Sequence, residues 1–131
     1  TTGSTDLAMR DEVERLSALR ARAFAEADPA LLATALVPGS AAGDEARAGV
    51  EALRRQGLRY RGVQLHVRSL RVRSRTATSV DADVVADVSA YEVVDAQGRV
   101  VRRVAARSGA ASRLWLALTP QGWRVAQIEP G

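Results

Sequence analysis

The side chains best suited to chemistry in this 131-residue sequence are its single histidine and the acids around it. His66 and Asp87 form the one acid–base pair that the sequence suggests, because a bulge in the preceding strand would bring Asp87 near the register of His66. Tyr60 and Tyr91 are candidate proton donors for the same site. The alternative is that His66 is an ordinary surface or packed residue, which is common for a lone histidine in a strand.

Other chemistries lack the residues that they need. Without cysteine, the chain has no disulfide, thiolate metal site or cysteine nucleophile, and without lysine it has no Walker-type phosphate loop. Only carboxylates remain as metal ligands beside one histidine, and the acids of residues 81–87 serve better as arginine partners. We therefore expect no metal and no cofactor.

The chain is basic, but its composition points to codon usage rather than to a selected partner. The net charge is +4, all 19 basic residues are arginine, and there is no asparagine and a single isoleucine. A very GC-rich genome produces this bias, so the pI of about 10.8 is weak evidence for nucleic-acid binding. No apolar run approaches the roughly 18 residues of a membrane span, so we expect no membrane insertion.

The N-terminal part of the chain predicts three helices. The first begins at a cap formed by Ser4 or Thr5 and has an apolar arc along one side. A short second helix begins at Asp28, which is followed by a proline at the first helical position. The third ends at Gly57, a residue suited to the left-handed conformation that closes helices. Residues 1–5 read as a linker-like tail before a single domain of residues 6–131.

After Gly57 the apolar period changes to two, which predicts strands. The parity slips at Arg68 and Ser69, and a β-bulge there explains the slip. The turn sequences DAQG and PQG separate three further strands. The predicted fold class is α+β, with three N-terminal helices packed on a strongly curved antiparallel sheet of four to five strands. The inward positions of its clearest strand are valines and alanines: Val80, Ala82, Val84, Ala86, Val88 and Ala90.

The stretch YRGVQLHVRSLRVRSR contains no acid, whereas the strand that follows it contains several. If the residues between them form a hairpin turn, Arg73 faces Asp81 and Arg71 faces Asp83, and opposite charges that face each other across strands stabilise a sheet. Paired arginines leave little free basic surface, so we expect no nucleic-acid binding. The alternative, a basic nucleic-acid-binding module, would need bare arginines and exposed aromatic rings.

The order of the elements and the ending GWRVAQIEPG, with Trp123 in a final strand, resemble the nuclear transport factor 2-like superfamily, a cone-shaped α+β fold. The segment RARAFAEADPALLATALVPGS looks like actinobacterial accessory domains that are appended to Ser/Thr kinases, and the tail is similar to Mce-associated envelope proteins. This resemblance implies a larger, membrane-tethered protein and a place on the extracytoplasmic side. It transfers no functional residue.

Two function classes follow from these observations. The favoured one is a non-catalytic interaction, regulatory or ligand-sensing domain, because the inward positions are apolar and the acids lie on the other face. Its partner would be a protein, a second copy bound through the sheet, or a small apolar ligand inside the cone. The alternative is a SnoaL-like isomerase or cyclase that uses the histidine–aspartate pair. The candidate binding residues are Tyr60, Tyr91, Trp115 and Trp123.

Overall fold

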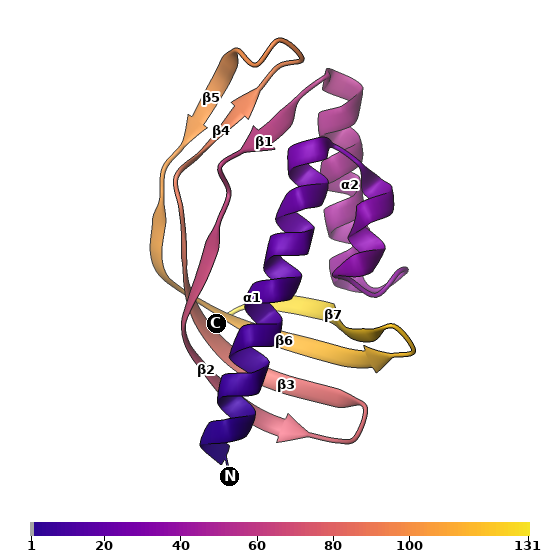
Figure 1. The fold of residues 1–131 in the computed structure, drawn as a ribbon, viewed down its shortest axis with the longest axis vertical. Coiled ribbons are helices and arrows are strands. Elements are labelled where there is room, and N and C mark those ends of the chain that lie inside the picture. The colour runs from indigo at the N-terminus through magenta and orange to yellow at the C-terminus, as the bar shows by residue number, and fades with distance from the viewer. Residues whose placement is uncertain (1) are drawn as a thin grey trace.

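The computed structural model describes residues 2–131, with side chains from Thr5 onward. Two α-helices and a short 3-10 helix precede seven β-strands (Figure 1). The helices are α1 (Thr2–Glu26), η1 (Pro29–Thr34) and α2 (Ala41–Gln56). The strands are β1 (Arg59–Arg61), β2 (Leu65–Arg75), β3 (Ser79–Val88), β4 (Tyr91–Val94), β5 (Val100–Val104), β6 (Arg107–Thr119) and β7 (Gly122–Pro130). None of the described helices combines the length and apolar character needed to cross a membrane.

The strands form two antiparallel sheets, in the orders β1-β4-β5 and β2-β3-β6-β7. The chain runs from β1 into β2, from β3 into β4 and from β5 into β6, so three long strands pass from one sheet to the other at a common bend (Figure 1). The prediction of a single sheet of four to five strands is therefore wrong. The predicted curvature is present, and it is sharp enough to interrupt the hydrogen-bond ladder and divide the sheet.

Hydrogen bonds around Ser89 hold the bend. Its N–H donates to the carbonyl of Gln64 at 2.9 Å, and the Gln64 N–H donates to the Ser89 hydroxyl at 2.9 Å. The hydroxyl in turn donates to the carbonyl of Gly62 at 2.7 Å. Gly62 has a φ of 89°, a conformation that favours glycine. The serine side chain thus replaces the ladder hydrogen bonds that the bend removes.

The predicted second helix is the six-residue 3-10 helix η1, so the fold has two α-helices rather than three. Asp28 caps it, as predicted, by accepting a hydrogen bond from a backbone N–H. Beyond η1 the Val37 N–H donates to the carbonyl of Val125, and the Val125 N–H donates to the carbonyl of Ala35, both at 2.9 Å. These bonds join the chain to β7 and prevent a longer helix.

The first helix begins at Thr2, before the predicted cap at Ser4 or Thr5. Of the predicted linker-like residues 1–5, residues 2–5 lie within α1, and residue 1 lies outside the described part of the chain. The carboxylate of Asp6 accepts a hydrogen bond from the Val72 N–H of β2 at 3.1 Å. This contact ties the start of α1 to an edge strand of the larger sheet.

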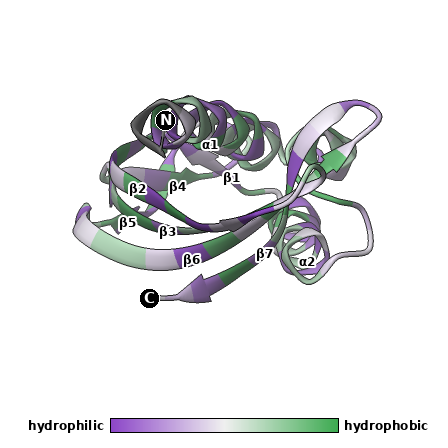
Figure 2. Ribbon diagram, turned by 90° about the horizontal axis from the view of Figure 1, so that it is seen from below, coloured by the Kyte–Doolittle hydropathy of each residue, from purple (hydrophilic) through white to green (hydrophobic). Residues whose placement is uncertain are grey.

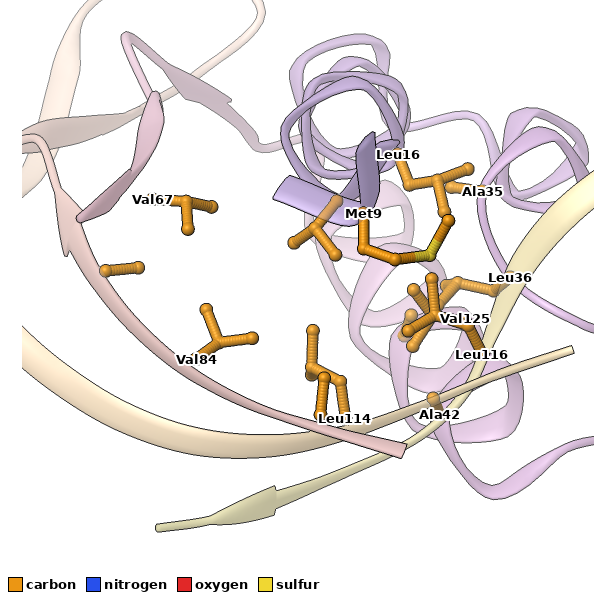
Figure 3. Packing of buried hydrophobic residues seen from close by; sticks show 14 of the residues in the cluster. Met9, Leu16, Ala35, Leu36, Ala42, Val67, Val84, Leu114, Leu116 and Val125 are labelled. Atoms are coloured by element: carbon orange, nitrogen blue, oxygen red, sulfur yellow. The ribbon is translucent and has the colours of Figure 1, made fainter. Parts of the chain in front are cut away.

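The concave side of the larger sheet is covered by α1, and α2 lies beside β7 (Figure 2). Met9 and Leu16 of α1 pack in one apolar cluster with Val67, Val84 and Leu114 of the sheet (Figure 3). Burying a side chain of this size contributes roughly 1.5–3 kcal/mol. The inward positions of β3 predicted by alternation are buried: Val80, Ala82, Val84 and Ala86. The remaining two of the predicted set, Val88 and Ala90, are not buried.

The outer face of the β2–β3 hairpin confirms part of the predicted charge pairing. The register shift predicted at Arg68 and Ser69 is present. Arg71 lies opposite Asp83, and its Nη2 is 3.6 Å from Oδ2 of that carboxylate. Cross-strand ion pairing therefore accounts for part of the basic stretch.

A second register shift, after Val72, makes the other predicted pair wrong. It places Ser74 opposite Asp81, and the Nη1 of Arg73 instead lies 3.4 Å from Oδ1 of Asp83. The sequence pattern shows no second slip, because polar residues occupy both sides of this end of the hairpin.

Asp81 bonds instead to Arg113 of β6, and the two donor–acceptor distances are 2.9 Å and 2.6 Å. Arg113 lowers the pKa of Asp81 below its ordinary value of 3.8, chiefly through these hydrogen bonds. We expect Asp81→Asn to reduce the free energy of unfolding at neutral pH by at most about 1 kcal/mol, because water screens a pair near the surface.

This contribution is present above the ordinary pKa and is lost as the pH falls through the lower pKa of the folded state. Urea denaturation of parent and variant should therefore give a difference that narrows towards about pH 2. Asp83→Asn is the control, since its arginine contacts are longer, at 3.4 Å and 3.6 Å, and its effect should be smaller. If Asp81→Asn reduced the free energy of unfolding equally at neutral pH and near pH 2, the assignment would be contradicted.

The ends of α1 and α2 have the same geometry but different residues. In each, an N–H two residues past the helix donates to the carbonyl five residues earlier, at 3.0 Å in α1 and 2.9 Å in α2. The residue directly after α1 is Ala27, with a φ of 49°, and the residue after α2 is Gly57, with a φ of 68°. This arrangement favours glycine, so alanine is strained there.

We expect Ala27→Gly to raise the free energy of unfolding by about 0.5 kcal/mol, because the strain relieved exceeds the entropy that glycine adds to the unfolded chain. The reciprocal change Gly57→Ala should lower it by about 1 kcal/mol. Nothing lies within 4 Å of a Cβ built at Gly57, so only backbone strain acts there. Urea denaturation midpoints measure both changes, and a destabilised Ala27→Gly would contradict the expectation.

Candidate functional site

The predicted acid–base pair is brought into register, but its two side chains have other partners. His66 and Asp87 lie opposite each other in the β2–β3 hairpin. The imidazole is 62% exposed, and its Nδ1 lies 3.5 Å from Oε2 of Glu14 in α1. The Asp87 carboxylate accepts a hydrogen bond from Arg68 Nε at 2.7 Å and one from the Gly109 N–H at 2.8 Å.

These surroundings do not favour acid–base chemistry. The hydrogen bond from the Gly109 N–H, followed by that from Arg68, lowers the pKa of Asp87 and makes it a weaker base. Acid–base sites usually depend on a desolvated titratable group, whereas His66 is largely exposed. Gly109, with a φ of 65°, lies within the register shift between β3 and β6, so Asp87 supports this irregularity.

The two tryptophans lie in different environments. Trp115 of β6 lies beneath Arg113, whose guanidinium carbon is 4.6 Å from the ring centroid. Trp123 of β7 lies opposite Leu118 and packs against the hydrophobic core. Trp115 is therefore available for contacts outside the core, and Trp123 has a packing role.

The two tyrosines come together near the bend. Tyr60 of β1 stacks on Phe24 of α1, with ring centroids 5.2 Å apart and an interplanar angle of 16°. Tyr91, the first residue of β4, lies against Tyr60 with centroids 4.9 Å apart. The three rings thus join the C-terminal half of α1 to the smaller sheet, above the bend in Figure 1.

Arg20 completes this group, which we call the arginine–tyrosine cluster: Arg20, Phe24, Tyr60 and Tyr91. The Arg20 guanidinium carbon lies 4.7 Å from the centroid of Phe24. Desolvation lowers the pKa of Arg20, and attraction to Glu45 and to the two tyrosines offsets part of this effect. No sequence pattern singles out Arg20, because its only signal is an Arg–Phe pair at i,i+4 spacing.

The Tyr91 hydroxyl of the cluster holds its proton more firmly than a free tyrosine does. Burial is the main cause of a raised pKa for Tyr91, and the nearby charges of Arg102 and Arg20 act in the opposite direction. Tyr60, Tyr91 and Arg20 are all partly exposed. The cluster therefore presents hydrogen-bond donors that solvent or a ligand can reach.

Two hollows lie on the helical side of the molecule. The first, of about 430 Å³, lies between η1 and α2 over Leu32 and Leu36. The second, of about 460 Å³, lies beyond the C-terminal end of α2, and the two share Asp28 and Arg54. His66 lines neither of them. Both have the size of small-ligand sites, but neither corresponds to the concave side of the sheet that α1 covers.

Within residues 5–131, no three side chains of the metal-binding types gather in an arrangement that could hold an ion. The acids of β3 are occupied by arginines, as Asp81 is by Arg113 and Asp87 by Arg68.

No protein-family model and no curated protein matches the sequence. Among solved structures, the intermembrane space region of the chloroplast protein ARC6 matches with a TM-score of 0.69 at 13% identity, over 96% of this chain and 97% of that one. Aln2 from a Streptomyces species matches with a TM-score of 0.54 at 19% identity, over 93% and 90%. A putative aromatic ring hydroxylase from Novosphingobium aromaticivorans matches with a TM-score of 0.56 at 11% identity, over 91% and 85%.

Structures described as having a cystatin-like fold also match, with TM-scores of 0.46–0.48. At these identities the similarity concerns the fold alone. The predicted α+β class agrees with the observed helices and antiparallel sheets, and the resemblance to the nuclear transport factor 2-like superfamily stays a prediction. The finer resemblance to actinobacterial accessory domains stays a prediction.

Proposed function

We propose that this chain is a non-catalytic binding domain, which contacts a partner or a small ligand through its surface. The observation that carries the proposal is the apolar packing between α1 and the larger sheet. Side chains such as Met9 and Val84 occupy the position that a substrate pocket would need. Among the described residues, no polar or charged side chain is fully buried. A binding role on the surface is compatible with this packing.

The setting of the domain belongs to the same proposal. We infer from the resemblance that it belongs to a larger, membrane-tethered actinobacterial protein on the extracytoplasmic side. The partner is a protein or a second copy of the domain, and nucleic acid is not expected. Arginines of the outer face that already contact carboxylates support this choice: Arg68, Arg71, Arg73 and Arg113.

The competing function is a SnoaL-like isomerase or cyclase that uses His66 as base. Incubating the domain with a panel of small ketones and polyketide-like substrates, followed by nuclear magnetic resonance, should give unchanged compounds. Conversion by the parent domain that His66→Gln abolishes, and that Glu14→Gln leaves intact, would identify an enzyme and refute the proposal. The second variant is the control, because Glu14 contacts the imidazole without being a candidate base.

Self-association through the outer face of the larger sheet is the simplest form of this binding role. The face carries Trp115 and several ion pairs, so a dimer formed there should be polar and should weaken as salt rises. Sedimentation at high micromolar concentration in low salt should detect it, and Trp115→Ala should reduce it. Arg47→Ala, on α2, is the control that leaves it unchanged. A parent protein that is monomeric under these conditions contradicts the dimer.

A further inference from the structure

Arg20 is the charged side chain whose surroundings are least explained by the fold. Burial lowers its pKa, which reflects a loss of hydrating water around the guanidinium. The acid whose charge acts on it is Glu45, yet among the described residues no carboxylate forms an ion pair with Arg20. An arginine does not escape this desolvation by losing its proton, because it stays charged in proteins.

A partly desolvated charge without a partner destabilises a fold, because some of its hydration is lost and no hydrogen bond replaces it. The cluster offers Arg20 the face of Phe24 and two tyrosine hydroxyls, which are neutral and cannot balance its charge as a carboxylate does. Arg113 shows the contrast, since Asp81 accepts two hydrogen bonds from it. The missing component at Arg20 is a hydrogen-bond acceptor that carries negative charge.

We propose that the arginine–tyrosine cluster binds the carboxylate of a small organic acid with an apolar body. The guanidinium matches a carboxylate with two parallel N–H donors. The hydroxyls of Tyr60 and Tyr91 are hydrogen-bonded to each other, so one of their two protons stays available to a ligand. The rings provide an apolar wall against which the body of the acid packs. This inference rests on the proposed binding function, because it names the ligand class that such a domain would take.

The position of the cluster fits this role. Tyr91 directly follows the bend, and Arg20 and Phe24 lie on α1, so the site is built from rigid elements rather than from a loop. Partial exposure of Arg20, Tyr60 and Tyr91 leaves the donors within reach of a ligand. Arg102, which is exposed on β5 and acts on Tyr91, adds positive charge near the cluster.

The first experiment measures binding to the intact domain by calorimetry and by the shift of its melting temperature. The probes are benzoate, benzyl alcohol as the uncharged body, acetate as the charge alone, and inorganic phosphate. We expect benzoate to bind, acetate to bind about tenfold more weakly because it lacks the apolar body, and benzyl alcohol to give no shift. Phosphate that binds as well as benzoate, or a shift with benzyl alcohol alone, would overturn the assignment.

The second experiment separates a binding role of Arg20 from a structural one. Arg20→Met keeps a long apolar stem and removes the charge, so we expect the free domain to melt at the same or a higher temperature and benzoate to lose its effect. Tyr91→Phe should weaken benzoate binding about threefold, since it removes one neutral hydrogen bond. The control is Arg22→Met on the same helix, where the exposed side chain pairs with Glu26 and binding should be unchanged.

A lower melting temperature for Arg20→Met, together with no benzoate effect on the parent, would show that Arg20 is a structural residue and would refute the site. Benzoate binding that persists in Arg20→Met would place the acid elsewhere and refute it too. Either result is distinguishable from a failure of the proposed non-catalytic function, because that failure would be observed as turnover that His66→Gln abolishes. The calorimetric titration with benzoate still tests the Arg20 site independently of such turnover.

Discussion

The bend at Ser89 is the constraint on which the rest of the structure depends. An uninterrupted sheet could not curve enough to surround α1, so three strands leave their ladder at the same level, and the Ser89 hydroxyl satisfies the backbone groups of Gly62 and Gln64. Asp87 does the same for the neighbouring irregularity by accepting the Gly109 N–H. Short polar side chains and positive-φ glycines therefore determine the concave shape.

The concave shape determines what the interior can contain. Because α1 lies along it, the space that a cone leaves for a ligand is filled by aliphatic side chains such as Leu16 and Val67. The charged side chains are displaced to the outer face, where most have cross-strand partners and solvent. His66 lies on the edge strand, where its largely exposed ring reaches Glu14 at the side of α1. The packing of α1 thus fills the concave side of the larger sheet. The candidate binding site lies instead at the arginine–tyrosine cluster, between α1 and the smaller sheet.

Local patterns predicted the fold where each residue's environment depends on its neighbours in sequence. Alternation identified the buried positions of β3, and the parity slip at Ser69 identified a real register shift. Prediction failed where distant contacts decide. The bridge between Val125 and the segment after η1 stops the second helix. The register shift before Ser74 moves Arg73 away from the position opposite Asp81. Neither feature has a signal in the local sequence.

The candidate site was predictable by half for the same reason. Tyr60 and Tyr91 stand out because aromatic residues are rare in this chain, but Arg20 is one of many arginines and looks like the others in sequence. What separates it is three-dimensional: exposed arginines such as Arg102 keep their hydration, so the lack of a carboxylate costs them little. Arg20 is partly buried beside Phe24 of the same helix and the two tyrosines of the smaller sheet, and this burial lowers its pKa. A carboxylate from outside the chain would supply the negative charge that the neighbours of Arg20 lack.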